Sequence, residues 1–278
     1  MSFEIGRVRI AGLAVPCARG ADGVVRDARE LASDWIGPTL DPCFLSHIEN
    51  RVPGLPELYG DRLANLPFGG GSHLVCVGQN FADHAAELST TEQREDPLCY
   101  LNPYYTLSVS GAIAIPDGCC TVSWEGELAV VIGRSAHQLP DEESSLAVIS
   151  GYTTSNDLGD YDWTLNRGGQ WVKGKAFPDF NPIGTWIRVG RDCHPPQDSF
   201  LTTRVNGAIV QRAPLSSMLH APQYLVWYIS QFFCLEPGDV INCGTPGGTA
   251  LAAGQFLQVG DLVDVSVSGL NTLRTRLT

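Results

Sequence analysis

Long apolar runs, internal repeats and low-complexity tracts are absent from this 278-residue sequence. A membrane-spanning helix needs about 18 or more consecutive apolar residues, so we expect no membrane span. Positive charge is also scarce, because 18 Lys and Arg residues face 30 Asp and Glu residues and the formal net charge is −12. No patch rich in Lys or Arg interrupts this deficit, and an acidic chain repels phosphate backbones. We therefore expect no nucleic-acid partner.

Nine cysteines are present, but none of them lies in a Cys-x-x-Cys pair. Their scattered positions do not support a zinc ribbon or a thioredoxin-type site. The N-terminal stretch "MSFEIGRVRIAGLAV" lacks a basic segment followed by a long apolar core and a cleavage site. The sequence therefore predicts a cytoplasmic protein with reduced thiols, most of them buried as small core residues.

Glycine and proline are plentiful, with 30 and 18 copies, and 44% of the residues are apolar. This composition favours many short strands over long helices around a substantial core. We predict a mainly β fold with a few helices, in which residues 1–70 form a small N-terminal subdomain and residues 71–278 form the larger domain. The expected elements are strands near 73–78, 112–116, 127–133, 148–157, 182–190, 239–244 and 261–270, a hairpin over 199–211 that turns at Asn206-Gly207, and a helix within 221–235.

The stretch "WEGELAVVIG", residues 124–133, begins with two glutamates and continues as a short apolar strand. Residues i and i+2 of a strand point to the same face, so Glu125 and Glu127 aim two carboxylates at one place. Like charges at this spacing raise each other's pKa and cost stability unless a positive charge lies between them. A hard divalent cation supplies that charge through oxygen ligands. The alternative to a cation site is an exposed strand end with solvated carboxylates. On Glu125 and Glu127 alone, this alternative is the better interpretation.

A third carboxylate changes this balance. Asp157 stands where the β-rich segment "SGYTTSND" ends at a turn, although an Asp in that place is by itself ordinary turn chemistry. Three carboxylates from two strands can form one face of an octahedron and leave positions for water and a bidentate substrate. The sequence thus predicts a divalent-cation site at Glu125, Glu127 and Asp157, with Mg²⁺ as the first choice and Mn²⁺ or Ca²⁺ as alternatives.

Several motifs then follow one another in the order of a known family. They are "VCVGQNFADHAAE", "WEGELAVVIG", "SGYTTSND", "QWVKGKAFPDFNPIG", "VNGAIVQ", "LEPGDVINCGTPGG" and "FLQVGDLVDVSVSGL". On these residues the chain resembles the fumarylacetoacetate hydrolase family in its bacterial single-chain form, from about residue 73 to the C-terminus and more faintly before it. The resemblance implies a mixed β-roll with an open-ended metal site. It also implies C–C hydrolysis, decarboxylation, hydration or isomerisation of 2-oxo acids and 1,3-dicarbonyl compounds.

The resemblance implies catalytic roles for three further residues. His84 and Glu87 are three positions apart and share a helix face, and in the family such a pair orients and deprotonates the attacking water. Lys175 matches the family's active-site lysine, a fixed positive charge beside the developing oxyanion, whereas Lys173 is expected to be solvated. Without the resemblance, His84 reads as a surface histidine and Lys175 as a solvated lysine.

Three residues are expected to bind the substrate, namely Gln79, Tyr161 and Thr245. Thr245 lies in "GTPGG" and would offer a hydroxyl and a backbone N–H to a substrate oxygen. A plain tight turn is the alternative reading of that stretch.

The chain departs from the family pattern where members hold a substrate carboxylate. Where the family has an arginine and a glutamine, this chain has Tyr161 and Thr164, and where the family has a lysine, it has Asn102. Either Arg167 or Arg94 is available as a substitute. The simpler expectation is a changed, bulkier substrate in a more aromatic pocket. That pocket would be lined by Tyr161, Trp163, Tyr104 and Tyr105.

These residues lead to a functional hypothesis with stated alternatives. We expect a metal-dependent enzyme that hydrolyses a C–C bond in a bulky 1,3-dicarbonyl or 2-oxo acid. Decarboxylation, dehydration or isomerisation by the same enolate chemistry is the first alternative, and a non-catalytic member that kept the fold is the second. The aromatic stretch "YLVWYISQFF" favours a homodimer. The polar segment 84–97 is predicted to be a mobile lid.

Overall fold

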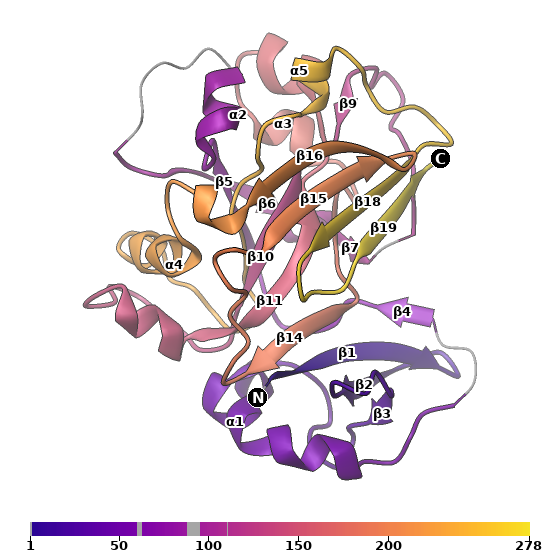
Figure 1. The fold of residues 1–278 in the computed structure, drawn as a ribbon, viewed down its shortest axis with the longest axis vertical. Helices are drawn as coiled ribbons and strands as arrows, with labels where there is room; N and C mark the ends of the chain where they lie inside the picture. The colour runs from indigo at the N-terminus through magenta and orange to yellow at the C-terminus, as the bar shows by residue number, and fades with distance from the viewer. Residues whose placement is uncertain (1, 60–62, 88–94, 110) are drawn as a thin grey trace.

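The computed structural model describes residues 2–59, 63–87, 95–109 and 111–278 (Figure 1). Strands dominate these residues and the helices are few and short, so the predicted mainly β class is confirmed. Among the described residues, no helix is long and apolar enough to cross a membrane. Five of the nine cysteines are buried, and none of the nine forms a disulfide within the described part of the chain.

The largest sheet contains twelve strands and runs through the middle of the molecule (Figure 1). Two of its central strands, β10 (Gly126–Ile132) and β11 (Ile149–Asn156), are buried along their whole length; burial on both faces explains the apolar run Leu128–Ile132 of β10. The main path of the sheet is β3 (Arg26–Asp27), β2 (Leu13–Arg19), β1 (Ser2–Ile10), β14 (Trp186–Gly190), β11 (Ile149–Asn156), β10 (Gly126–Ile132), β17 (Val240–Asn242), β5 (His73–Gly78) and β6 (Leu98–Pro103). Off this path lie β4 (Leu63–Asn65), β7 (Leu107–Val109) and β13 (Asn181–Ile183).

A second sheet of five strands packs against β10 and β11. Buried and more exposed residues alternate along its inner strands, as expected for a sheet with one face on the core. The predicted hairpin turns at Asn206-Gly207, and both residues have the positive φ of a two-residue hairpin turn. The sheet order is β16 (Ala208–Pro214), β15 (Phe200–Val205), β18 (Leu262–Val267), β19 (Leu273–Leu277) and β8 (Ala112–Ile113), and a separate pair joins β12 (Gly159–Asp160) to β9 (Val122–Ser123).

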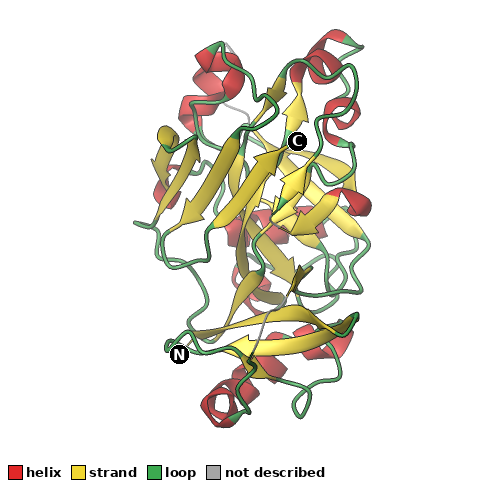
Figure 2. Cartoon of the chain, turned by 90° about the vertical axis from the view of Figure 1, so that its right-hand side faces the viewer, coloured by secondary structure: helices red, strands yellow, loops and turns green. Residues whose placement is uncertain are grey.

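The N-terminal residues occupy one end of the molecule, around β1 to β4 and α1 (Pro42–Ile48) (Figures 1 and 2). Their strand β1 pairs antiparallel with β14 of the central sheet. One apolar core unites Trp35 and Leu45 of this end with Val131 and Ile187 of the rest. The boundary expected near residue 70 stays a prediction, and the sheet runs continuously across it.

Four further helices lie around the sheets: α2 (Ala82–Glu87), α3 (Val172–Lys175), α4 (Pro222–Ser230) and α5 (Ala250–Ala253). The longest, α4, falls inside the predicted range 221–235 and buries Leu225, Val226 and Ile229. A short π-helix follows β12, over Asp162–Asn166. Helices α2 and α3 lie at the end of the molecule opposite α1 (Figure 1), and both carry residues of the predicted site.

Candidate active site

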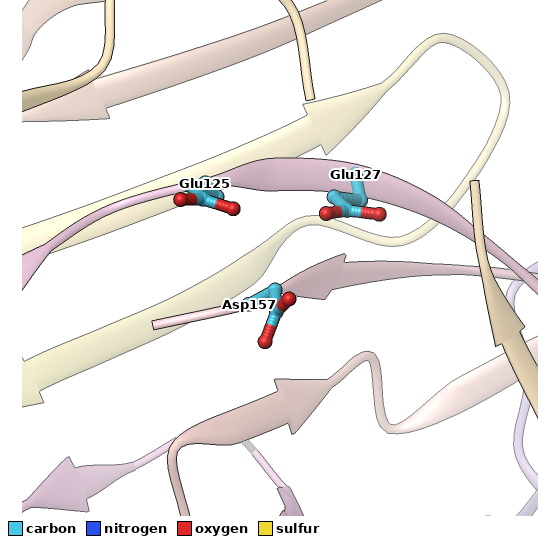
Figure 3. A group of neighbouring side chains, drawn as sticks. All are labelled: Glu125, Glu127 and Asp157. Atoms are coloured by element: carbon cyan, nitrogen blue, oxygen red, sulfur yellow. The ribbon is translucent and has the colours of Figure 1, made fainter. Parts of the chain in front are cut away.

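Three carboxylates meet where two neighbouring strands carry them. Glu125 and Glu127 flank Gly126 at the start of β10, and Asp157 directly follows β11 (Figure 3). The strands are antiparallel, with Gly126 opposite Asn156, so both ends reach the same place. One oxygen of each carboxylate lies within 4.8 Å of the other two. The structure therefore brings together the three residues predicted to bind a metal.

Glycine is required between the two glutamates. A Cβ atom on Gly126 would lie 2.1 Å from Thr203 Oγ1, which belongs to the second sheet. The Gly126 N–H donates to Gln211 Oε1 at 3.0 Å, and its carbonyl accepts from Thr245 Oγ1 at 2.9 Å. The close approach of the second sheet thus fixes the backbone from which both glutamates project.

Lys175 supplies the positive charge closest to the cluster. Its Nζ lies 2.8 Å from Glu125 Oε2, 2.8 Å from the Asp157 carbonyl oxygen and 3.0 Å from Asp157 Oδ2. Burial opposes its charge, but Asp157 and Glu125 outweigh that effect and raise the Lys175 pKa. The side chain is 5% exposed, whereas Lys173 is exposed to solvent as predicted.

The electrostatics of the cluster favour a bound cation. Three ionised carboxylates and one ammonium leave a formal charge of −2 in a buried place. Burial, followed by the charges of Asp157 and Glu125, raises the Glu127 pKa well above its ordinary value. A divalent cation would neutralise this charge through oxygen ligands, which are the ligands that Mg²⁺, Mn²⁺ and Ca²⁺ prefer. The residues present fit such a cation.

His84 and Glu87 lie on one face of α2, as their spacing predicts. His84 Nδ1 is 3.6 Å from Glu87 Oε2, and it is buried without a hydrogen-bond partner among the described residues. Glu87 Oε1 accepts the backbone N–H of Gly248 at 2.7 Å. The Gly248 carbonyl in turn accepts from Trp124 Nε1 at 3.0 Å. The loop after β17 therefore orients Glu87 toward the imidazole.

One pocket collects seven of the nine predicted site residues, and only Glu87 and Asp157 are not among those that line it. Of the described residues that line it, Lys175 is the single Lys or Arg. The lining residues are Val77, Gly78, Gln79, His84, Tyr100, Glu125, Glu127, Tyr161, Thr164, Leu165, Trp171, Lys175 and Thr245.

Gln79 has a left-handed backbone, with φ of 56°, which costs free energy for a residue with a Cβ atom. Its neighbour Asn80 holds this conformation, since the Asn80 amide donates to the carbonyls of His220 and Cys243 at 2.9 and 2.7 Å. Thr245 also lines the pocket, but its hydroxyl donates to the Gly126 carbonyl and accepts from Gln211. Substrate binding by Gln79 and Thr245 stays a prediction.

The residues that replace the family's carboxylate clamp have distinct surroundings. Tyr161 lines the pocket with its hydroxyl buried and unpartnered among the described residues, and burial, with the charge of Glu125, raises its pKa to about 12. The Thr164 hydroxyl donates to the Asp160 carbonyl at 2.7 Å. Arg167 pairs with Asp162 and stacks on Trp163; it does not line the pocket. Arg94 lies outside the described residues, as does half of the predicted lid, residues 88–94.

The prediction of which aromatic residues line the pocket is wrong for three of four. Trp163 packs on Phe177, and the hydroxyls of Tyr104 and Tyr105 donate to the carbonyls of Gly238 and Ala176. Their places are taken by Tyr100 and Trp171, which the sequence analysis missed. No local pattern identifies these two, because strand pairing and helix packing bring them to the site.

The fold and this site define a β-rich protein built around a carboxylate cluster suited to a hard cation. The family model described as Fumarylacetoacetate (FAA) hydrolase C-terminal matches residues 73–278. The chain belongs to the fumarylacetoacetate hydrolase family, as the motifs predict.

Relatives and solved structures agree with this assignment. A protein from Burkholderia multivorans, whose name places it among the hydrolases, is 34% identical over 90% of each chain. The structure of fumarylacetoacetate hydrolase from Exiguobacterium antarcticum superposes with a TM-score of 0.83 at 27% identity, over 99% of both chains. A 5-carboxymethyl-2-hydroxymuconate delta-isomerase from Mycobacterium smegmatis gives a TM-score of 0.77 at 29% identity, over 99% of this chain and 98% of that one. The family thus includes hydrolases and isomerases, and the chain is similar to both.

Proposed function

We propose that this protein is a divalent-metal-dependent hydrolase that cleaves a C–C bond in a bulky 1,3-dicarbonyl or 2-oxo acid compound. The observation that carries the proposal is one pocket lined by Glu125, Glu127, Lys175 and His84, with the third carboxylate, Asp157, grouped with the two glutamates beside it. Mg²⁺ is the first choice of cation. Bound by Glu125, Glu127 and Asp157, it would polarise a carbonyl oxygen and stabilise the negative charge that develops as the C–C bond breaks.

The chain's own residues supply the proton transfers and the remaining charge. A proton on His84 Nδ1, which faces Glu87 Oε2, leaves Nε2 free to accept a proton from the attacking water. The resulting hydroxide adds to the carbonyl carbon, the C–C bond breaks, and the carbon that leaves as an enolate takes a proton back. Lys175 holds a fixed positive charge beside the oxygens that become negative.

The wall of the pocket supports a bulky substrate with an apolar end. Tyr100, Tyr161 and Trp171 contribute aromatic surface, and Leu165 adds an apolar side chain. An arginine grips a carboxylate with two parallel hydrogen bonds, and a phenol cannot replace that grip. Lys175 is already engaged by Glu125 and Asp157. Small substrates that depend on a carboxylate clamp should therefore be poor ones.

An isomerase acting by the same enolate chemistry is the second candidate, because the chain is also similar to a solved isomerase. Decarboxylation, dehydration and a non-catalytic role are further alternatives. Incubation in ¹⁸O water with Mg²⁺ separates these possibilities. Hydrolysis of a phenyl-substituted 1,3-dicarbonyl places ¹⁸O in the carboxylate product, whereas isomerisation and decarboxylation place none there.

The choice of substrate is tested by comparing acetylpyruvate and oxaloacetate with benzoylpyruvate. We expect faster turnover of the aryl compound. A kcat/KM of about 10⁴ M⁻¹s⁻¹ or more on the two small acids, typical of a dedicated enzyme, would reject the bulky-substrate reading and leave the hydrolase reading intact.

A further inference from the structure

Asp157 is the most heavily hydrogen-bonded carboxylate of the cluster. Its Oδ1 accepts from the side-chain amides of Asn181 at 2.8 Å and Asn102 at 3.4 Å. Its Oδ2 accepts from the Tyr100 hydroxyl at 2.6 Å and lies 3.0 Å from Lys175 Nζ. A carboxylate has about four lone-pair positions. Two amides and one phenol therefore leave a single position, on Oδ2, where the Lys175 ammonium now lies.

The Tyr100 ring is fixed in place by its neighbours. It lies on β6, where its backbone pairs with Cys76 of β5, and it packs edge-on against Trp171 with ring centroids 5.5 Å apart. Trp171 covers Gly78, where a Cβ atom would come within 2.2 Å of the indole. With this packing the hydroxyl cannot turn away from Asp157 without moving α3 or β5.

The orientation of Asn181 is fixed by its own hydrogen bonds. Its Oδ1 accepts from the Ser155 hydroxyl and from the Asn242 amide, both at 3.1 Å. Since these donors identify the oxygen of the side chain, the nitrogen must face Asp157. Asn181, Ser155 and Asn242 are all buried. Asp157 Oδ1 is thus committed to protein donors by a network that extends away from the pocket.

We propose that Asn181 is a positioning residue that occupies Asp157 Oδ1 and, together with Tyr100 on Oδ2, restricts Asp157 to one metal-binding lone pair, which disfavours Ca²⁺ relative to Mg²⁺. Mg²⁺ takes six ligands in a strict octahedron, for which single-oxygen carboxylates are suited. Ca²⁺ takes six to eight oxygens and commonly uses carboxylates through both oxygens. The inference rests on the cation site of the proposed function, but it concerns binding and selectivity, and needs no substrate.

The test is isothermal titration of Mg²⁺ and Ca²⁺ into metal-free wild type, Tyr100→Phe and Tyr104→Phe. Loss of a protein hydrogen bond to a metal-binding side chain typically lowers metal affinity by about 10–100-fold. We expect Tyr100→Phe to weaken both cations by that factor with little change in the ratio of the two affinities, because Asp157 Oδ1 stays occupied by the amides of Asn181 and Asn102. Tyr104→Phe is the matched control, since it removes a half-buried phenol hydroxyl that donates to the Gly238 carbonyl; it should leave both affinities within about twofold.

Asn181→Ala is the deciding variant, because it frees a lone pair on Asp157 Oδ1; we expect it to weaken Mg²⁺ more than Ca²⁺ and to move the ratio of the two affinities toward Ca²⁺ by about tenfold. An unchanged ratio in Asn181→Ala, or an equal change in Tyr104→Phe, overturns the inference while the proposed function stands. A wild type that binds neither cation overturns both. If the variants change the ratio of Mg²⁺ to Ca²⁺ affinity as expected but the wild type turns over no substrate, the proposed function alone is overturned.

Discussion

Replacing Lys175 with methionine separates the structural role of this residue from its place in the proposed chemistry. Methionine fills nearly the same space without the charge. The substitution leaves Glu125 and Asp157 without the ammonium that lies 2.8 Å and 3.0 Å from their oxygens. Removing one partner of a buried ionic group costs about 3–5 kcal/mol. At about 2–4 °C per kcal/mol, the metal-free variant should melt roughly 6–20 °C below wild type.

Mg²⁺ should reverse part of this loss, and it should act more strongly on the variant than on wild type. Without the ammonium, the formal charge of the ionised cluster changes from −2 to −3, and no cation competes for its oxygens. A ligand at 100 times its Kd stabilises a protein by about 2.7 kcal/mol. At one fixed Mg²⁺ concentration, the rise in melting temperature of Lys175→Met should therefore exceed that of wild type, although turnover is lost.

Differential scanning fluorimetry with EDTA and with Mg²⁺ measures both effects. Lys173→Met is the matched control, because that lysine is exposed and its ammonium donates to the Arg167 carbonyl; the substitution should change stability by no more than about 0.5 kcal/mol. A metal-free Lys175→Met protein that melts with wild type, or a smaller Mg²⁺ response than that of wild type, would show that the ammonium does not balance this cluster.

Three further predictions concern protonation, helix docking and assembly. Burial, followed by the charges of Asp157 and Glu125, raises the Glu127 pKa above its ordinary value of 4.5. Stability from its bound proton is therefore present at acid pH, and the metal-free melting temperature should fall as the pH rises from that ordinary value through the higher folded-state pKa. A fall of the same size in Glu127→Gln would contradict this cause. A Cβ atom on Gly247 would lie 3.0 Å from Glu87 Oε1, so Gly247→Ala should displace Glu87 and lower kcat about tenfold or more, with an unchanged Mg²⁺ affinity by titration. An equal loss of kcat and Mg²⁺ affinity would show that the substitution does not act through Glu87 alone. The stacked aromatic rings of α4, among them Tyr224 and Tyr228, favour a homodimer, and light scattering that finds a monomer at micromolar concentration would exclude it.

The sequence by itself determined those features that depend on local spacing. Alternation along a strand places Glu125 and Glu127 on one face, and the three-residue spacing of His84 and Glu87 places them on one helical face. Asn206-Gly207 marks the hairpin turn because both residues accept positive φ. Ordered motifs were also enough to identify the family. Each of these properties follows from residues that are close together in the chain.

Only the tertiary structure decided which distant side chains surround these groups. Tyr100 is 57 residues from Asp157, and Asn181 is 24 residues from it; strand order and crossings bring them into contact, and local periodicity does not encode that order. The same holds for Arg167, which is close to the site in sequence but is drawn to Asp162 and Trp163. The spacing of Glu125 and Glu127 along the chain places their carboxylates on one side of the strand. The hydrogen bonds that restrict Asp157 result from the packing of sheets and helices, because such contacts depend on the whole path of the chain.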